Sequence, residues 1–62
     1  MSRRDSLIEV EYGELLHETD NAILFDFEGE EIWIPRSLID SHDASNQLVE
    51  IPLWFAEQKG IV

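Results

Sequence analysis

Apolar and polar residues alternate most clearly between positions 22 and 27. In an extended chain this spacing places Ile23, Phe25 and Phe27 on one face and leaves the other face to the residues between them. A period of two residues is typical of a strand with one buried face. We therefore predict a strand over residues 22–27 whose inner face belongs to the core.

The residues that follow this strand predict a hairpin. Positions 28–29 hold Glu-Gly, which fits a two-residue loop with glycine at a position of positive φ. The partner strand is expected over residues 30–34 and ends at Pro35, because proline has no N–H to donate to a neighbouring strand. Trp33 would then share the polar face, lie near Leu24 and be partly exposed.

Weaker patterns predict the elements on either side of the hairpin. Apolar and acidic residues alternate over 8–12, which indicates another strand. Gly13 is expected to mark a bulge or bend, with a further strand segment over 14–19. A single helical or 3₁₀ turn is expected over 37–39, and residues 40–46 are expected to form a polar loop.

The C-terminal part predicts a closing strand over 47–51 and a short helix bracketed by Pro52 and Gly60. Apolar residues cover much of this helix, so we expect it to be clamped on more than one side. The predicted fold class is α+β: a small twisted antiparallel sheet of three to five strands, with an SH3-like barrel as one form of it, covered by the C-terminal helix. Residues 1–6 are expected to be a flexible N-terminal tail, and residues 7–62 a single α+β domain.

Acidic residues are unevenly distributed along the 62 residues. The chain has 14 Asp and Glu against 4 Lys and Arg, a formal charge of −10. The segment from Asp5 to Pro35 contains no Lys or Arg and carries that whole charge. Such a field repels nucleic acids and anionic membranes and attracts basic proteins. The acids of this segment are Asp5, Glu9, Glu11, Glu14, Glu18, Asp20, Asp26, Glu28, Glu30 and Glu31.

Patterns that could support catalysis or metal binding are weak. Positions 41–43 hold Ser-His-Asp, the residue types of a hydrolase triad, but sequence neighbours cannot point at one another as a triad requires. The polar segment 40–46 lacks the glycine and glutamate of a calcium-binding loop, and the two histidines have no partners at zinc-ligand spacing. A chain this short also offers little room for an enclosed active site. We therefore predict no enzyme, no catalytic residues, no metal and no cofactor.

The sequence also limits where the protein is expected to act. It has no cysteine, and no apolar run approaches the ~18 residues that a membrane span needs. The first four residues are too short to serve as a signal peptide. A soluble intracellular protein, monomeric and without direct contact to nucleic acid or membrane, is the expectation.

Carboxylates placed on strands would lie close together. Residues i and i+2 of a strand share a face about 6.6 Å apart, and the next strand is about 4.8 Å away. A row of carboxylates on one side of the sheet would then coarsely match a DNA strand, which offers a negative charge every ~3.4 Å along its axis. An acidic face that is merely solvated and has no partner is the competing interpretation. The predicted partner-binding residues are Glu9, Glu11, Glu14, Asp26, Glu28, Glu30 and Glu31.

Three pieces between residues 22 and 60 resemble short proteins encoded by phages and prophages. These are residues 22–24, residues 31–37 with the motif W-I-P-R-S, and residues 51–60 with the motif I-P-x-W-x-A-E-x-K-G. In size and charge the chain is similar to anti-CRISPR proteins, several of which resemble DNA electrostatically and occupy the DNA-binding surface of an interference complex. The resemblance implies a cytoplasmic location in a bacterial host. No functional residue is carried over from it, because that class shares no motif.

The leading hypothesis is therefore a phage-derived inhibitor, an anti-CRISPR. Its acidic DNA-mimicking surface would bind the basic nucleic-acid channel of a CRISPR–Cas effector and block target DNA. The alternative is a small SH3-like accessory module that docks on a phage replication or recombination protein through its Trp33 side.

Overall fold

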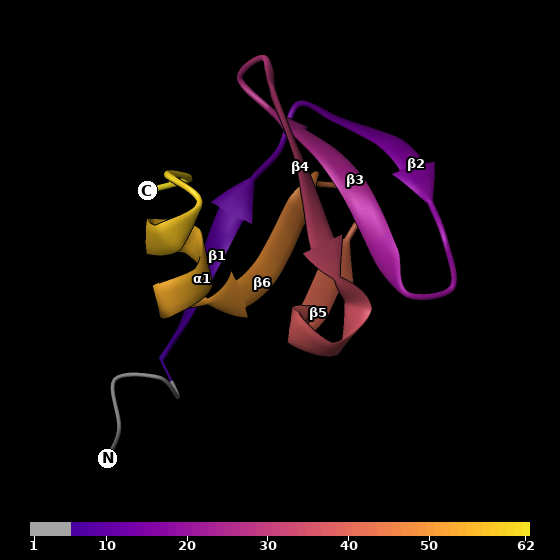
Figure 1. Cartoon of the computed structure of the whole chain (residues 1–62). Helices are drawn as coiled ribbons and strands as arrows, with labels where there is room; N and C mark the ends of the chain where they lie inside the picture. Colours follow the sequence, from indigo (N-terminus) through magenta and orange to yellow (C-terminus); the bar gives the residue numbers. More distant parts are fainter. Residues whose placement is uncertain (1–5) are drawn as a thin grey trace.

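Two three-stranded antiparallel sheets and one short helix form residues 6–62, the part of the chain that the computed structural model describes (Figure 1). The predicted flexible tail lies outside this part except for Ser6, whose carbonyl accepts a hydrogen bond from the Leu53 N–H. The elements are β1 (Leu7–Glu11), β2 (Glu14–Glu18), β3 (Ala22–Phe27), β4 (Glu30–Pro35), the 3₁₀ turn η2 (Arg36–Leu38), β5 (Ser41–Asp43), β6 (Leu48–Pro52) and α1 (Leu53–Gln58).

The strand order is β1-β6-β5 in one sheet and β2-β3-β4 in the other. The expected antiparallel pairing with a short C-terminal helix is confirmed. The expectation of one sheet with three to five strands is wrong, because β1 and β2 pair with different partners. Within residues 6–62 the ladders stay in two sheets and do not close into a barrel. The fold is therefore mostly β.

The chain passes from one sheet to the other at Tyr12 and Gly13. The N–H of Tyr12 donates to the carbonyl oxygen of Gln47 at 3.0 Å, and the N–H of Gly13 donates to that of Asp26 at 2.8 Å. The predicted bulge or bend at Gly13 is therefore a bend, at which the chain passes between the sheets. The irregularity lies at Leu16, where the register between β2 and β3 shifts.

The predicted hairpin of β3 and β4 is confirmed. Glu28 and Gly29 form its loop with φ angles of 54° and 90°, both in the left-handed region that such a turn requires. The carboxylate of Asp26 accepts a hydrogen bond of 2.7 Å from the Gly29 N–H, which fixes the turn further. Leu24 lies directly opposite Trp33, as the alternation predicted.

Part of the predicted polar loop is a strand. β5 pairs with β6, and His42 lies opposite Val49. The His42 ring meets Phe25 edge-on with centroids 5.5 Å apart, and its Nε2 shares a hydrogen bond of 2.7 Å with the Tyr12 hydroxyl. Because the histidine ring packs beside core aromatics, these three residues pair as a strand without any aliphatic side chain.

Helix α1 packs by one side only. Phe55 and Ala56 are buried, whereas Trp54 is 39% exposed. The prediction that the helix is clamped on more than one side is wrong, because Trp54, Glu57 and Gln58 leave the rest of the helix surface exposed. Pro52 precedes the helix and Gly60, with φ 74°, follows it. Among residues 6–62, no helix has the length and apolarity to cross a membrane.

The core lies where the inner residues of both sheets meet the helix. The four side chains with essentially no exposure come from three strands: Phe25, Ile34, Val49 and Ile51. Ile23, Phe25 and Phe27 all face this core, so the predicted inner face of β3 is confirmed. The buried cluster comprises Val10, Tyr12, Ile23, Phe25, Phe27, Ile32, Ile34, Val49, Ile51, Phe55 and Ala56.

Removing one methylene group from this small core should be measurable. We expect Ile34→Val to lower the free energy of unfolding by about 0.5–1.5 kcal/mol, because Ile34 has no exposed surface and the site has little room to collapse. Leu7→Val, at a position that is 45% exposed, should cost less than half as much. Urea denaturation measures both, and equal losses would contradict the assigned core.

Candidate functional site

Three carboxylates form a row across the outer face of the sheet β2-β3-β4, and we call this row the acidic row. Glu14 lies opposite Asp26, and Asp26 lies opposite Glu31. Directly opposed residues on antiparallel strands have Cβ atoms about 4.5–5.5 Å apart. Three negative charges are therefore held side by side on the backbone of three hydrogen-bonded strands, and their spacing does not depend on a flexible loop.

Carboxylates also line two adjoining hollows near the β3–β4 hairpin. The larger, of about 430 Å³, is lined by Glu11, Glu28 and Glu30 among others, and the smaller, of about 330 Å³, by Glu11, Asp26 and Glu28 among others. Glu11 and Glu28 border both hollows. Asp26 lines the smaller hollow and belongs to the row, so the hollows and the row are continuous. We call the acidic surface the set Glu11, Glu14, Asp26, Glu28, Glu30 and Glu31.

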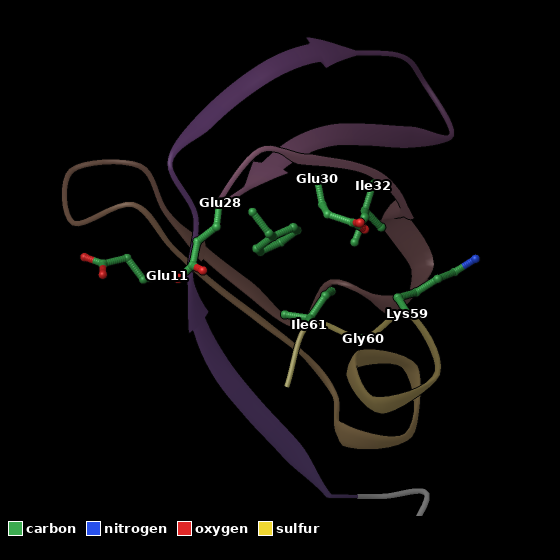
Figure 2. A pocket seen from close by; sticks show the side chains of 8 residues that line it. Glu11, Glu28, Glu30, Ile32, Lys59, Gly60 and Ile61 are labelled. Atoms are coloured by element: carbon green, nitrogen blue, oxygen red, sulfur yellow. The ribbon is translucent and has the colours of Figure 1, made fainter.

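The larger hollow has an apolar floor beneath its acidic rim. Phe27, Ile32 and Ile61 line it together with the acids and Lys59. In Figure 2 the Glu30 side chain turns inward toward Ile32, whereas Lys59 extends away from the hollow. The hollow thus combines aliphatic and aromatic surface with negative charge, a combination that suits the stem and head of a basic side chain.

Glu9 is the one predicted binding residue that neither borders a hollow nor belongs to the row on β2-β3-β4. It sits on β1 opposite Glu50 of β6, on the outer face of the other sheet. Glu50 in turn lies opposite Ser41. Sequence reasoning did not single out Glu50, although the inward alternation of Val49 and Ile51 could have placed it outward beside Glu9.

The predicted row of carboxylates on one sheet face is confirmed for Asp26 and Glu31, which lie opposite each other, but it does not hold for all of the predicted acids. Glu11 reaches the acidic surface from β1, which belongs to the other sheet. Glu28 lies in the hairpin loop and does not continue the face of Asp26 on β3. Strands and a loop from both sheets bring these acids together.

The cations of residues 6–62 leave the acidic surface largely uncompensated. Arg36 pairs with Glu18 at 3.2 Å, and its Nε donates to the Thr19 carbonyl oxygen at 2.8 Å. The Lys59 ammonium lies over the Phe55 ring, 5.7 Å from its centroid. Within the described part of the chain, Arg36–Glu18 is the only ion pair.

A row of apolar and aromatic side chains runs beside the acidic row on the same outer face. His17 lies opposite Leu24, and Leu24 lies opposite Trp33. The rings of His17 and Trp33 meet edge to face with centroids 6.0 Å apart, so they lean toward each other over Leu24. Trp33 nevertheless remains 45% exposed. We call His17, Leu24 and Trp33 the aromatic row.

The Ser-His-Asp segment does not form a catalytic relay. On β5 the side chains alternate, so Ser41 and Asp43 lie on the opposite face from His42. Ser41 Oγ is 3.4 Å from Glu50 Oε1, and hydrogen bonds from Asn46 lower the pKa of Asp43. Across residues 6–62, no three His, Asp or Glu side chains are grouped as a metal site requires.

Comparisons of the chain with protein-family models, with curated proteins and with solved structures find no match.

Like charges in the acidic row should cost stability. We expect Glu31→Gln to raise the free energy of unfolding by roughly 0.2–1 kcal/mol at low salt, because it removes repulsion with the opposed Asp26. The gain should shrink as added salt screens the charges. Glu18→Gln is the matched control: it lies on the same sheet but pairs with Arg36, so it should bring no gain. Urea titrations at two ionic strengths measure the free energy of unfolding of both variants. A stabilisation by Glu31→Gln that persists at high salt would contradict this explanation.

We expect the pKa of the Tyr12 phenol in the folded protein to lie above its ordinary value. Burial, and then the nearby Asp43 carboxylate, raise the pKa of Tyr12 above 10.0. The folded state therefore holds the phenolic proton more tightly than the unfolded state. This contribution to stability is complete below pH 10 and is lost as the pH rises through the folded pKa.

The chain has one tyrosine, so tyrosinate absorbance reports Tyr12 alone. We expect its midpoint in the native protein to lie above the midpoint measured in denaturant. Coinciding midpoints would show that Tyr12 is not buried beside Asp43.

Proposed function

We propose that this protein is an inhibitor of a nucleic-acid-binding host complex, an anti-CRISPR of the DNA-mimicking type. Its acidic surface binds the basic channel of a CRISPR–Cas effector and excludes target DNA. The proposal places the protein in the cytoplasm of a bacterial host. The observation that carries it is the cross-strand row Glu14–Asp26–Glu31, continued around the hairpin by Glu11, Glu28 and Glu30.

Two physical features support this proposal over a merely solvated acidic face. The row is built on paired strands, so the backbone positions of its residues are set before any partner arrives, and this preorganisation reduces the entropy lost on binding. The only described cation that borders the hollow, Lys59, extends away from it. Charge complementarity of this kind speeds encounter and selects a basic partner.

The spacing of the charges suits a surface that normally holds a nucleic acid. The Cβ atoms of opposed residues lie about 5 Å apart across the strands, and a DNA strand carries one phosphate charge for every ~3.4 Å of helix axis. The match is one of sign and approximate pitch. A channel lined with Lys and Arg would meet a dense, regular array of negative oxygens in both cases.

A second function is favoured by one specific observation. Trp33 is 45% exposed on the same outer face, which suits a small accessory module that docks on a phage replication or recombination protein. Because the two sheets of residues 6–62 do not close into a barrel, this alternative rests on the exposed Trp33 and not on an SH3-like fold. The two functions differ in whether the carboxylates or the indole carry the binding energy.

Charge reversal tests the leading function. In Glu11→Lys/Glu14→Lys/Glu31→Lys, three exposed members of the acidic surface are reversed, while Asp26, which holds the hairpin, is kept. We expect inhibition of target-DNA binding by purified CRISPR–Cas effectors to fall about tenfold or more, since close interfacial charge pairs contribute about 1.5 kcal/mol or more each. Competition binding with labelled target DNA measures this.

The matched control reverses three exposed acids outside the acidic surface: Asp20→Lys/Asp40→Lys/Glu57→Lys. It changes the net charge by the same amount and should inhibit like the wild type. Equal loss in both variants would mean that net charge alone acts. If no effector loses DNA binding to the wild-type protein, the inhibitor function is refuted.

A further inference from the structure

The outer face of β2-β3-β4 carries two adjacent rows of different chemistry. The acidic row lies nearer the β3–β4 hairpin loop. The aromatic row lies two residues farther from that loop on both β3 and β4. Residues i and i+2 on a strand lie about 6.6 Å apart on one face. Trp33 and Glu31 are such a pair, as are Leu24 and Asp26. The indole surface and the carboxylates are therefore within reach of one side chain.

We propose that this face docks an arginine-bearing segment of the partner, with a guanidinium group stacked on Trp33 and paired with Glu31. This inference rests on the proposed function and names the chemistry by which that partner is recognised. A cation over an indole face is attracted by the ring quadrupole, and tryptophan is the best aromatic ring for this contact. Glu31 supplies the opposite charge beside it.

The geometry selects arginine over lysine. The guanidinium group is planar, stacks on aromatic rings and presents a fork of donors that matches a carboxylate. An ammonium group is a compact, strongly hydrated point charge that gains less from a flat indole. Asp26, opposite Glu31, adds a second negative charge next to the same position.

Other occupants of the face fit it less well. A nucleic acid could stack a base on Trp33, but its phosphates would meet Glu14, Asp26 and Glu31. A second copy of this chain would bring one strongly acidic protein against another, with a formal charge of −10 on each. A basic segment satisfies the indole and the carboxylates together.

The two tryptophans provide a matched experiment. Trp33 is 45% exposed on the proposed face, and Trp54 is 39% exposed on α1. In the full-length Trp54→Phe variant, fluorescence reports Trp33 alone. The probes are a short arginine-rich peptide and a lysine-rich peptide of equal length and charge. We expect the arginine peptide to change Trp33 fluorescence and to bind about threefold to tenfold more tightly than the lysine peptide.

Substitution of each tryptophan then locates the preference. By calorimetry, Trp33→Ala should lose the preference for arginine, Trp33→Phe should keep part of it, and Trp54→Ala should keep all of it. Equal affinity for the two peptides, or an equal effect of both alanine variants, would overturn the inference. Tighter binding of a single-stranded oligonucleotide, or a dimer that Trp33→Ala dissociates, would also overturn it and would identify the other occupant.

The DNA-competition assay separates this inference from the proposed function. If Trp33→Ala inhibits like the wild type while the charge-reversed variant does not, the inhibitor function stands and arginine docking at Trp33 fails. If Trp33→Ala loses the arginine preference but no effector is inhibited, the docking chemistry stands and the inhibitor function fails.

Discussion

The crossing of the chain at Tyr12 and Gly13 is the link on which the rest of the molecule depends. Two consecutive N–H groups donate to different sheets, one to Gln47 beside β6 and one to Asp26 on β3. The Gln47 side chain adds a hydrogen bond of 2.6 Å to the Gly13 carbonyl oxygen. These contacts hold the end of β1 against the β3–β4 hairpin. Glu11 consequently borders the same hollows as Glu28, and an acidic surface forms from segments that belong to separate sheets.

The small core determines which way the acids on the strands face. Since Phe25, Ile34, Val49 and Ile51 must be buried from both sheets, the alternating positions between them face outward. No polar or charged residue of the described chain is fully buried. The cost is repulsion between neighbouring carboxylates in a domain whose size already limits its stability. The proposed basic partner would account for a surface kept at that cost, because solubility needs a net charge of only about 2–8.

In the proposed docking, the aromatic row would give the acidic surface a second means of discrimination. Carboxylates alone attract any basic protein, and salt weakens that attraction. An exposed indole two residues from Glu31 adds a contact that depends on shape and on the identity of the cation. Because both rows stand on the same three paired strands, their relative position is fixed by the sheet. Long-range attraction and short-range selection can therefore act on one partner segment.

The sequence by itself determined the local structure. A period of two residues fixed the inner face of β3, the opposition of Leu24 and Trp33, and the outward position of Asp26 and Glu31, because alternation in a strand and a two-residue loop leave one register. It also indicated the helix between Pro52 and Gly60.

Only the tertiary structure decided which strands are partners. The pairing of β1 with β6 joins residues about 40 positions apart, and no local pattern encodes it. The polar segment of β5 became a strand because β6 offered an edge, and Glu9 came to lie opposite Glu50 because β1 pairs with β6. Periodicity specifies the face on which a side chain lies, whereas the neighbours of that face depend on long-range packing of the whole core.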